Sequence, residues 1–208
     1  MSAIPDDAAR ARDVLQRAVD GDRFALGELW DTHNGALVRF LRSLRVREPD
    51  DVAADVWVDL ARRMPSIGAD PESFRKVLFT IGRRRAIDAH RLRARRPSVD
   101  VDPQSQHRFV DPAKATDEVV GDELVAQALL ARLPRAQAEV VALRIIAGFS
   151  AAEVAELTDR SEGAVRIMAM RGLRRLRDLA LEAGLGTSDE LPTSFEVTDH
   201  DGSTMVQP

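Results

Sequence analysis

The chain has 208 residues, which suffices for one large domain or two small ones, and its net charge is −4. It has no cysteine, which excludes disulfides and thiolate metal sites, and its 4 histidines are scattered, so we expect no metal. No apolar run reaches the length of a membrane span and the N-terminus lacks a signal-peptide pattern, so we expect a cytoplasmic protein without membrane insertion. A glycine-rich phosphate loop and a nucleophile beside a base are also missing, so we expect no catalytic residues, no enzyme activity and no cofactor.

Charge is distributed unevenly along the sequence. Residues 83–96 are rich in arginine, and Asp88 is the only acid among them. Acids dominate residues 100–123, and no lysine or arginine follows Arg177. The arginine-rich segment therefore predicts a cationic surface, although the chain as a whole is acidic.

Helical periodicity runs through the chain and no segment alternates as a strand would, so the predicted fold class is all-α. In chain order we expect helices over residues 6–20, 22–47, 50–64, 73–95, 117–133, 135–147, 150–157 and 161–182. The turn-forming residues of segment 65–73 predict a loop there.

The composition also predicts two helical domains on a tether. Residues 98–116 combine prolines and acids with little periodicity, so we expect a flexible linker between a domain over residues 1–97 and a domain over residues 117–183. Residues 184–208 are acidic, with Gly, Ser, Thr and Pro, and are expected to form a disordered tail. One hypothesis is that the acidic linker and tail fold back on the arginine-rich surfaces and limit DNA binding.

The stretch from Ser150 to Arg177 is predicted to form two helices with a corner between them. Ser150 and Glu153 fit a capping box, Ser161 can cap the second helix, and Asp159 lies at the corner, where left-handed backbone is usually needed. Apolar or small residues recur along the second helix at steps of four and three and are expected to face the core: Val165, Ala169, Gly172, Leu176 and Leu179. The pattern is typical of a DNA-binding helix-turn-helix; the alternative is an amphipathic hairpin with a solvated arginine face.

Two segments carry a family resemblance. "EVAELTDRSEGAVRIMAMRGLRRL" resembles the region 4 helix-turn-helix of the sigma-70 family, in particular its extracytoplasmic-function (ECF) group. "PDDVAADVWVDLARRMPSIGADPESFRKVLFTIGRRRAIDAHRLRARR" resembles region 2 of that family, and the resemblance covers roughly residues 21–179. It implies a bacterial transcription initiation factor that binds core RNA polymerase, directs it to promoters through −10 and −35 recognition, and melts the −10 element.

The resemblance also implies partners and binding residues. The implied partners are promoter DNA, an anti-sigma factor, and core polymerase through the clamp helices of its largest subunit and its flap region. The implied core polymerase-binding residues are Asp51, Val52, Asp55, Val56 and Trp57. The implied −10 DNA-binding residues are Ile67, Ser73, Arg75, Lys76, Arg83, Arg84, Arg91 and Arg95. The implied −35 DNA-binding residues are Ser161, Glu162, Gly163, Arg166, Ile167, Met170, Arg171 and Arg174.

Some assignments remain open at the level of the sequence. Trp57 fits a place in the hydrophobic core as well as it fits a docking surface, and the arginines of residues 83–96 fit a solvated face. Val77 stands where the family usually has a tryptophan, which weakens the expected packing of that helix, and Met168 stands where it usually has a basic residue. Met168 and Ile167 make the expected −35 reader more apolar than usual, which suits contact with a thymine methyl group. The main alternative function is a one-component helix-turn-helix regulator that acts without core polymerase, and a second alternative is a protein-interaction module.

Overall fold

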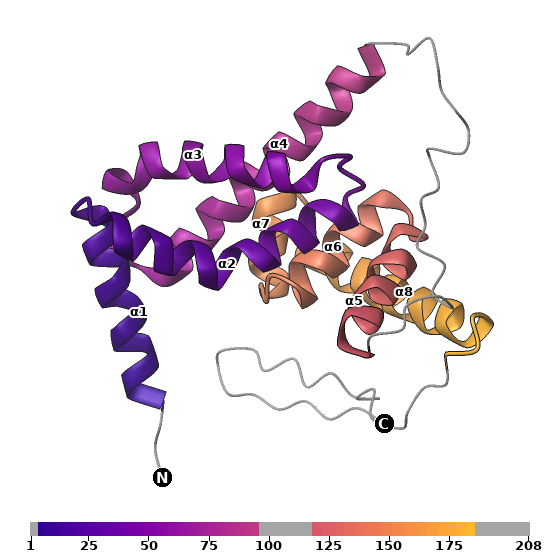
Figure 1. Ribbon diagram of the computed structural model, residues 1–208. Helices are drawn as coiled ribbons and strands as arrows, with labels where there is room; N and C mark the ends of the chain where they lie inside the picture. Colours follow the sequence, from indigo (N-terminus) through magenta and orange to yellow (C-terminus); the bar gives the residue numbers. More distant parts are fainter. Residues whose placement is uncertain (1–3, 96–117, 186–208) are drawn as a thin grey trace.

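The computed structural model describes residues 4–95 and 118–185, and all regular structure within these ranges is helical (Figure 1). The N-terminal unit consists of α1 (Ile4–Val19), α2 (Arg23–Ser43), α3 (Pro49–Ile67) and α4 (Pro71–Arg95). The C-terminal unit consists of α5 (Glu118–Ala131), α6 (Arg135–Ile145), α7 (Ala151–Thr158) and α8 (Glu162–Glu182). The predicted all-α fold class is confirmed, whereas the predicted linker and nearly all of the predicted tail lie outside the described residues.

The helices of the N-terminal unit begin at residues that suit helix starts. The side chain of Asp22 accepts a hydrogen bond of 2.8 Å from the backbone N of Phe24 at the start of α2. Asp70 accepts one of 2.9 Å from the backbone N of Ser73, directly before α4. Both α3 and α4 begin with a proline, whose fixed φ and missing N–H suit the first helical position.

Three predicted helix boundaries in this unit are wrong. Helix α2 ends at Ser43, not near residue 47, because Arg45 adopts a left-handed φ of 60° that closes the last turn. Helix α3 continues through Pro65 to Ile67, and α4 already begins at Pro71. The loop expected over residues 65–73 therefore shrinks to residues 68–70, and burial of the Met64 side chain holds the last turns of α3 against the core.

Aromatic and aliphatic side chains fill the core of the N-terminal unit. The ring centroid of Trp57 lies 5.2 Å from that of Trp30 and 6.3 Å from that of Phe74. Helices α2 and α4 pack closely, since a Cβ added at Gly82 would lie 2.8 Å from Cδ1 of Leu37. These contacts hold the long helix α4, whose C-terminal end extends beyond the other helices of the unit (Figure 1).

The two units share one hydrophobic core. The cluster that fills the N-terminal unit continues into the C-terminal unit through buried side chains of α6, α7, α8 and the loop after α6, namely Val140, Ala142, Leu143, Ala147, Phe149, Ala151, Val154 and Val165. A smaller cluster of Leu130, Leu133, Ala138 and Val141 lies within the C-terminal unit. The units are thus packed against each other, an arrangement on which the sequence is silent. None of the described helices is both long enough and apolar enough to cross a membrane.

Candidate nucleic-acid and polymerase interfaces

The helix-turn-helix forms as the sequence predicts. Ser150 Oγ accepts from the backbone N of Glu153 (3.2 Å), and the Glu153 carboxylate accepts from the backbone N of Ser150 (2.7 Å), which completes the capping box of α7. Asp159 forms the corner in left-handed conformation (φ 55°, ψ 51°), and Ser161 Oγ caps α8 by accepting from the backbone N of Ala164. These local contacts fix the direction in which α8 leaves the corner.

The predicted −35 residues lie on the open face of α8. Its opposite face is buried through Val165, Gly172 and Leu179, so the predicted apolar stripe does face the core. A Cβ at Gly172 would lie 2.6 Å from Cγ2 of Val141, which shows how closely α8 approaches α6. Of the predicted set, Glu162 is half-buried and the remaining members are exposed: Ser161, Gly163, Arg166, Ile167, Met170, Arg171 and Arg174. The structure therefore brings this set together on one accessible helix face.

The predicted −10 residues lie at the end of α3 and along α4, but they are not equally accessible. Arg84 and Arg91 are exposed, and each guanidinium lies near Asp88, at 4.0 and 3.8 Å. Arg75, Lys76 and Arg83 are half-buried. Ser73 is exposed and Ile67 half-buried, whereas the side chain of Arg95 lies outside the described residues.

The half-buried cations of α4 are in contact with the C-terminal unit. Arg83 Nε donates to Oε1 of Glu139 on α6 at 2.7 Å, and Lys76 forms an ion pair with Glu156 on α7. The guanidinium of Arg75 lies over the ring of Phe149, 4.9 Å from its centroid. The predicted −10 DNA-binding cations of α4, called the −10 track below, are therefore of two kinds. Arg75, Lys76 and Arg83 are covered by the C-terminal unit, and Arg84 and Arg91 are open to solvent.

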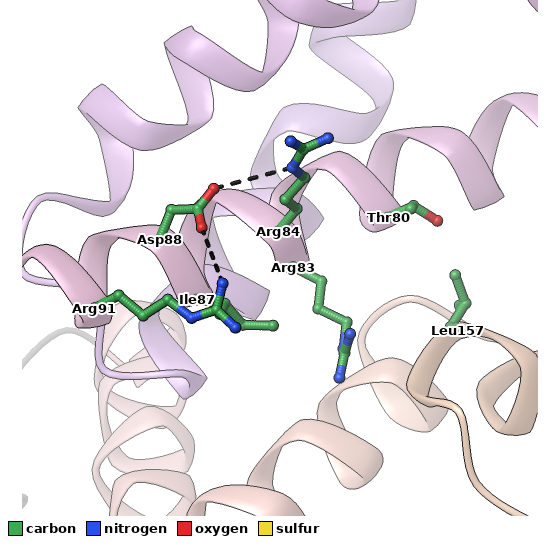
Figure 2. A pocket seen from close by; sticks show the side chains of 7 residues that line it. All are labelled: Thr80, Arg83, Arg84, Ile87, Asp88, Arg91 and Leu157. Carbon is green, nitrogen blue, oxygen red and sulfur yellow. Dashed lines mark ion pairs between the residues drawn. The ribbon is translucent and has the colours of Figure 1, made fainter.

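A pocket of about 360 Å³ lies at the junction of α4 and α7. Figure 2 shows Arg83 extending toward the C-terminal helices, whereas Arg84 and Arg91 turn toward Asp88. The pocket is cationic with apolar patches, and its lining comprises Thr80, Arg83, Arg84, Ile87, Asp88, Arg91 and Leu157. Within the described ranges, no cluster of three or more His, Asp or Glu side chains could hold a metal ion.

Arg85 has a structural role that the sequence analysis did not foresee. Its guanidinium donates to Oδ2 of Asp59 on α3 at 2.5 Å and lies 3.8 Å from Asp55. The hydrogen bond from Arg85 holds the pKa of the Asp59 carboxyl below its usual value. Arg85 thus ties α4 to α3, although it stands within the arginine-rich segment.

The predicted polymerase-binding residues of α3 differ in their exposure. Val56 is fully buried and Trp57 is 5% exposed, with its Nε1 donating to Oδ1 of Asn34 at 3.1 Å. These two side chains belong to the core, because Trp57 packs between Trp30 and Phe74. Asp51 and Asp55 are exposed, and Val52 is half-buried.

Val58 is a surface residue of α3 that the sequence analysis missed. Its side chain is 50% exposed, and it follows Asp51 and Asp55 at helical steps of four and three. The spacing itself is the signal that could have identified it. The accessible face of α3 therefore carries two carboxylates and an aliphatic side chain rather than an indole.

Comparisons with known proteins identify the family to which the chain is similar. A family model described as "Sigma-70, region 4" matches residues 124–176, which include α6, α7 and most of α8. The ECF RNA polymerase sigma factor SigD of Mycobacterium tuberculosis is 31% identical over 179 residues, covering 82% of this chain and 84% of SigD. The ECF RNA polymerase sigma factor ShbA of Streptomyces griseus is 30% identical over 178 residues, covering 80% and 93% of the two chains.

A solved structure is similar across both units. The structure of CnrH in complex with the cytosolic domain of CnrY aligns with a TM-score of 0.58 and 26% identity, over 83% of this chain and 97% of the other. The sequence relatives span both regions to which the resemblance pointed, and they cover most of their own length. The chain therefore belongs to the ECF group of sigma-70 family RNA polymerase sigma factors, which act in transcription initiation.

Proposed function

We propose that this sigma factor reads the −35 element of its promoters with the open face of α8. The observation that carries the proposal is the accessible face of α8 directly behind the left-handed corner at Asp159. In a helix-turn-helix, the first residues of the second helix meet base edges in the major groove, and later cations contact phosphates. Ile167 and Met170 are 47% and 63% exposed and suit contact with thymine methyl groups, while Arg171 and Arg174 suit phosphates.

The −10 element is the second DNA contact of the proposal. Opening a promoter requires that the non-template strand be held as single-stranded DNA, for which a cationic track beside base-binding positions is suited. Helix α4 supplies such cations at Arg75, Lys76, Arg83, Arg84 and Arg91. We assign this role to the domain over residues 1–97 and the −35 role to the domain over residues 117–183.

Core RNA polymerase is the proposed protein partner of α3. Asp51 and Asp55 can pair with cations of the clamp helices of the largest subunit, while Val52 and Val58 add apolar contact. The C-terminal unit is proposed to contact the flap region. An anti-sigma factor is the proposed regulatory partner, and the complex of CnrH with the cytosolic domain of CnrY supports a protein partner for this kind of chain.

The test is whether promoter binding depends on core polymerase. We expect the protein to shift a promoter duplex only when core polymerase is present; a one-component regulator binds the duplex alone. Asp51→Asn/Asp55→Asn should weaken core binding at least about tenfold, because charge pairs buried on binding cost about 2–5 kcal/mol when one partner is removed. The control Asp20→Asn/Asp31→Asn removes two other exposed carboxylates of the same unit and should bind core normally. Equal affinity of the two double variants for core polymerase would show that this face of α3 is not part of the interface.

A further inference from the structure

Glu139 joins the two units through a nearly buried charge. It lies on α6 and is 8% exposed. Its carboxylate oxygens lie 2.7 Å from Nε of Arg83 on α4 and 3.8 Å from the guanidinium of Arg160 at the helix-turn-helix corner. A carboxylate with so little access to water needs cationic partners to stay charged. Arg83 is one of the cations proposed to hold a DNA phosphate. In this structure the carboxylate of Glu139 is bound to Arg83 where that phosphate would bind.

Phe149 contacts the same helix with an aromatic ring. Its ring meets that of Phe79 edge-on, with centroids 5.5 Å apart and an interplanar angle of 88°, and it also lies beneath the Arg75 guanidinium. Gly148, at φ +70°, turns the chain after α6, and Arg144 holds the Phe149 carbonyl at 2.7 Å. Nucleic-acid bases also stack against arginine side chains of proteins, so the Phe149 ring lies against Arg75 as a base could.

Lys76 and Arg45 add further contacts between the two units. Lys76 of α4 pairs with Glu156 of α7. Arg45 donates to the carbonyls of Ala131 and Leu133 at the C-terminal end of α5, where helix carbonyls lack partners within the helix. The interface therefore combines a buried core with charge pairs that use the cations of α4.

We propose that the C-terminal unit acts as an internal mimic of the −10 strand. The C-terminal unit occupies the covered part of α4 until the two units separate. Glu139 and Glu156 take the place of phosphates at Arg83 and Lys76, and Phe149 takes the place of a base at Arg75. The inference rests on the proposed function, in which α4 holds the −10 strand. Its consequence is that the closed chain binds single-stranded DNA only through the open part of the track, at Arg84 and Arg91.

Separation of the units should change both the affinity and the salt dependence of DNA binding. When a protein must open before it binds, its apparent affinity is the affinity of the open form multiplied by the fraction of molecules that are open. Each phosphate neutralised on a single strand adds about 0.7 to the slope of log affinity against log salt. Release of Lys76 and Arg83, the two cations at which carboxylates replace phosphates, should therefore steepen this slope by about 1.4.

The first test weakens the interface from the side of the C-terminal unit. Glu139→Gln/Glu156→Gln leaves every proposed DNA-binding residue in place, and Asp178→Asn/Glu182→Gln is its control with the same change in net charge. Glu182 pairs with Arg132 and Arg175, which are both in the C-terminal unit. The readouts are binding of a mixed-sequence single-stranded DNA by fluorescence anisotropy, and the separation of dyes on Ala9→Cys and Ala183→Cys, which are unique thiols because the chain lacks cysteine.

We expect the interface variant to show a larger dye separation, at least about tenfold tighter DNA binding and the steeper salt slope. The control should match the wild type in all three. If the double variant does not fold, Glu156→Gln serves alone, because Glu156 is exposed, with an expected gain of about threefold. A larger dye separation without tighter binding, or no change in either, overturns the inference.

The second test closes the units covalently. Gln127 Nε2 donates to the backbone O of Arg39 at 3.4 Å, so Arg39→Cys/Gln127→Cys places two thiols across the interface, away from α4. In the interface variant, a short bis-maleimide bridge should return DNA affinity to the wild-type level. The same protein with each thiol capped by N-ethylmaleimide should keep the gain, and equal affinity of bridged and capped proteins overturns the inference.

A third variant separates failure of the inference from failure of the proposed function. Arg84→Ala/Arg91→Ala removes the open cations of the track and should weaken DNA binding by the closed protein. If it does not, α4 is not the −10 track, and the proposed function fails at this point. The dye separation still reports, independently of DNA, whether Glu139 and Glu156 hold the units together.

Discussion

Two half-buried histidines make stability sensitive to pH at the scale of single residues. Burial lowers the pKa of His33 below its usual value of 6.5, and the charge of Arg75 adds to the effect. Burial also lowers the pKa of His90, despite the hydrogen bond between its Nε2 and the carbonyl of Leu44. Both rings therefore favour the neutral form more strongly in the folded protein than in the unfolded chain.

The direction of the pH effect follows from proton binding. Below about pH 6.5 the unfolded chain protonates these histidines more readily than the folded chain does, so acidification lowers the free energy of unfolding. We expect lower stability at pH 5.5 than at pH 7.5 in urea denaturation, and a smaller difference in His33→Gln. The carboxyls with lowered pKa, such as Asp59 and Asp70, titrate below this range. A His33→Gln variant with an unchanged difference would contradict the assignment.

Residue roles divide into those that the sequence could predict and those that it could not. The corner at Asp159 and the capping box of Ser150 and Glu153 were predictable, because their partners lie within four residues. The role of Trp57 was not, because the rings that bury it come from Trp30 and Phe74 on other helices. Helical periodicity identifies an apolar stripe, but it does not say whether protein core or partner covers it.

At the scale of elements, the contact between α6 and α8 depends on the absence of a side chain at Gly172. An added Cβ would meet Cγ2 of the buried Val141 at 2.6 Å, and a β-branched side chain has little freedom to move. Gly172→Ala should therefore destabilise the protein by about 1–3 kcal/mol, as overpacking does.

The matched substitution for this prediction is Gly27→Ala. Gly27 lies in the interior of α2 with nothing within 4 Å of an added Cβ, so alanine there should stabilise the helix by up to about 1 kcal/mol. The midpoints of thermal and urea unfolding measure both effects. Equal midpoints for the two variants would show that α8 can move away from α6 without cost.

Helix boundaries were less predictable than helix identity. All expected helices are present, because apolar residues at helical spacing mark each of them. The errors near Arg45 and Pro65 arose where the sequence breaks local rules: arginine stands in a left-handed position, and proline stands inside a helix. In both cases neighbouring side chains are buried, namely Leu44 and Val46 beside Arg45 and Met64 beside Pro65. Burial depends on distant parts of the chain, which local rules do not include.

At the scale of the whole molecule, the packing of the two units was beyond local reasoning. Arg83 and Glu139 are 56 residues apart, and Lys76 and Glu156 are 80 apart, so no periodicity links them. The charge pattern indicated a cationic helix, but not that an acidic side chain of the same protein would meet it. The contact between units thus joins the two predicted DNA-binding regions into one body.

Transcription with purified bacterial core polymerase tests the central claim most directly. The template is supercoiled genomic DNA of the source organism, and the measurement is the mapping of transcript 5′ ends with and without the protein. We expect discrete starts that appear only when the protein is added and that share two upstream sequence elements. The absence of such starts, together with tight binding of promoter duplex by the protein alone, would contradict promoter selection by a polymerase subunit and favour a free regulator.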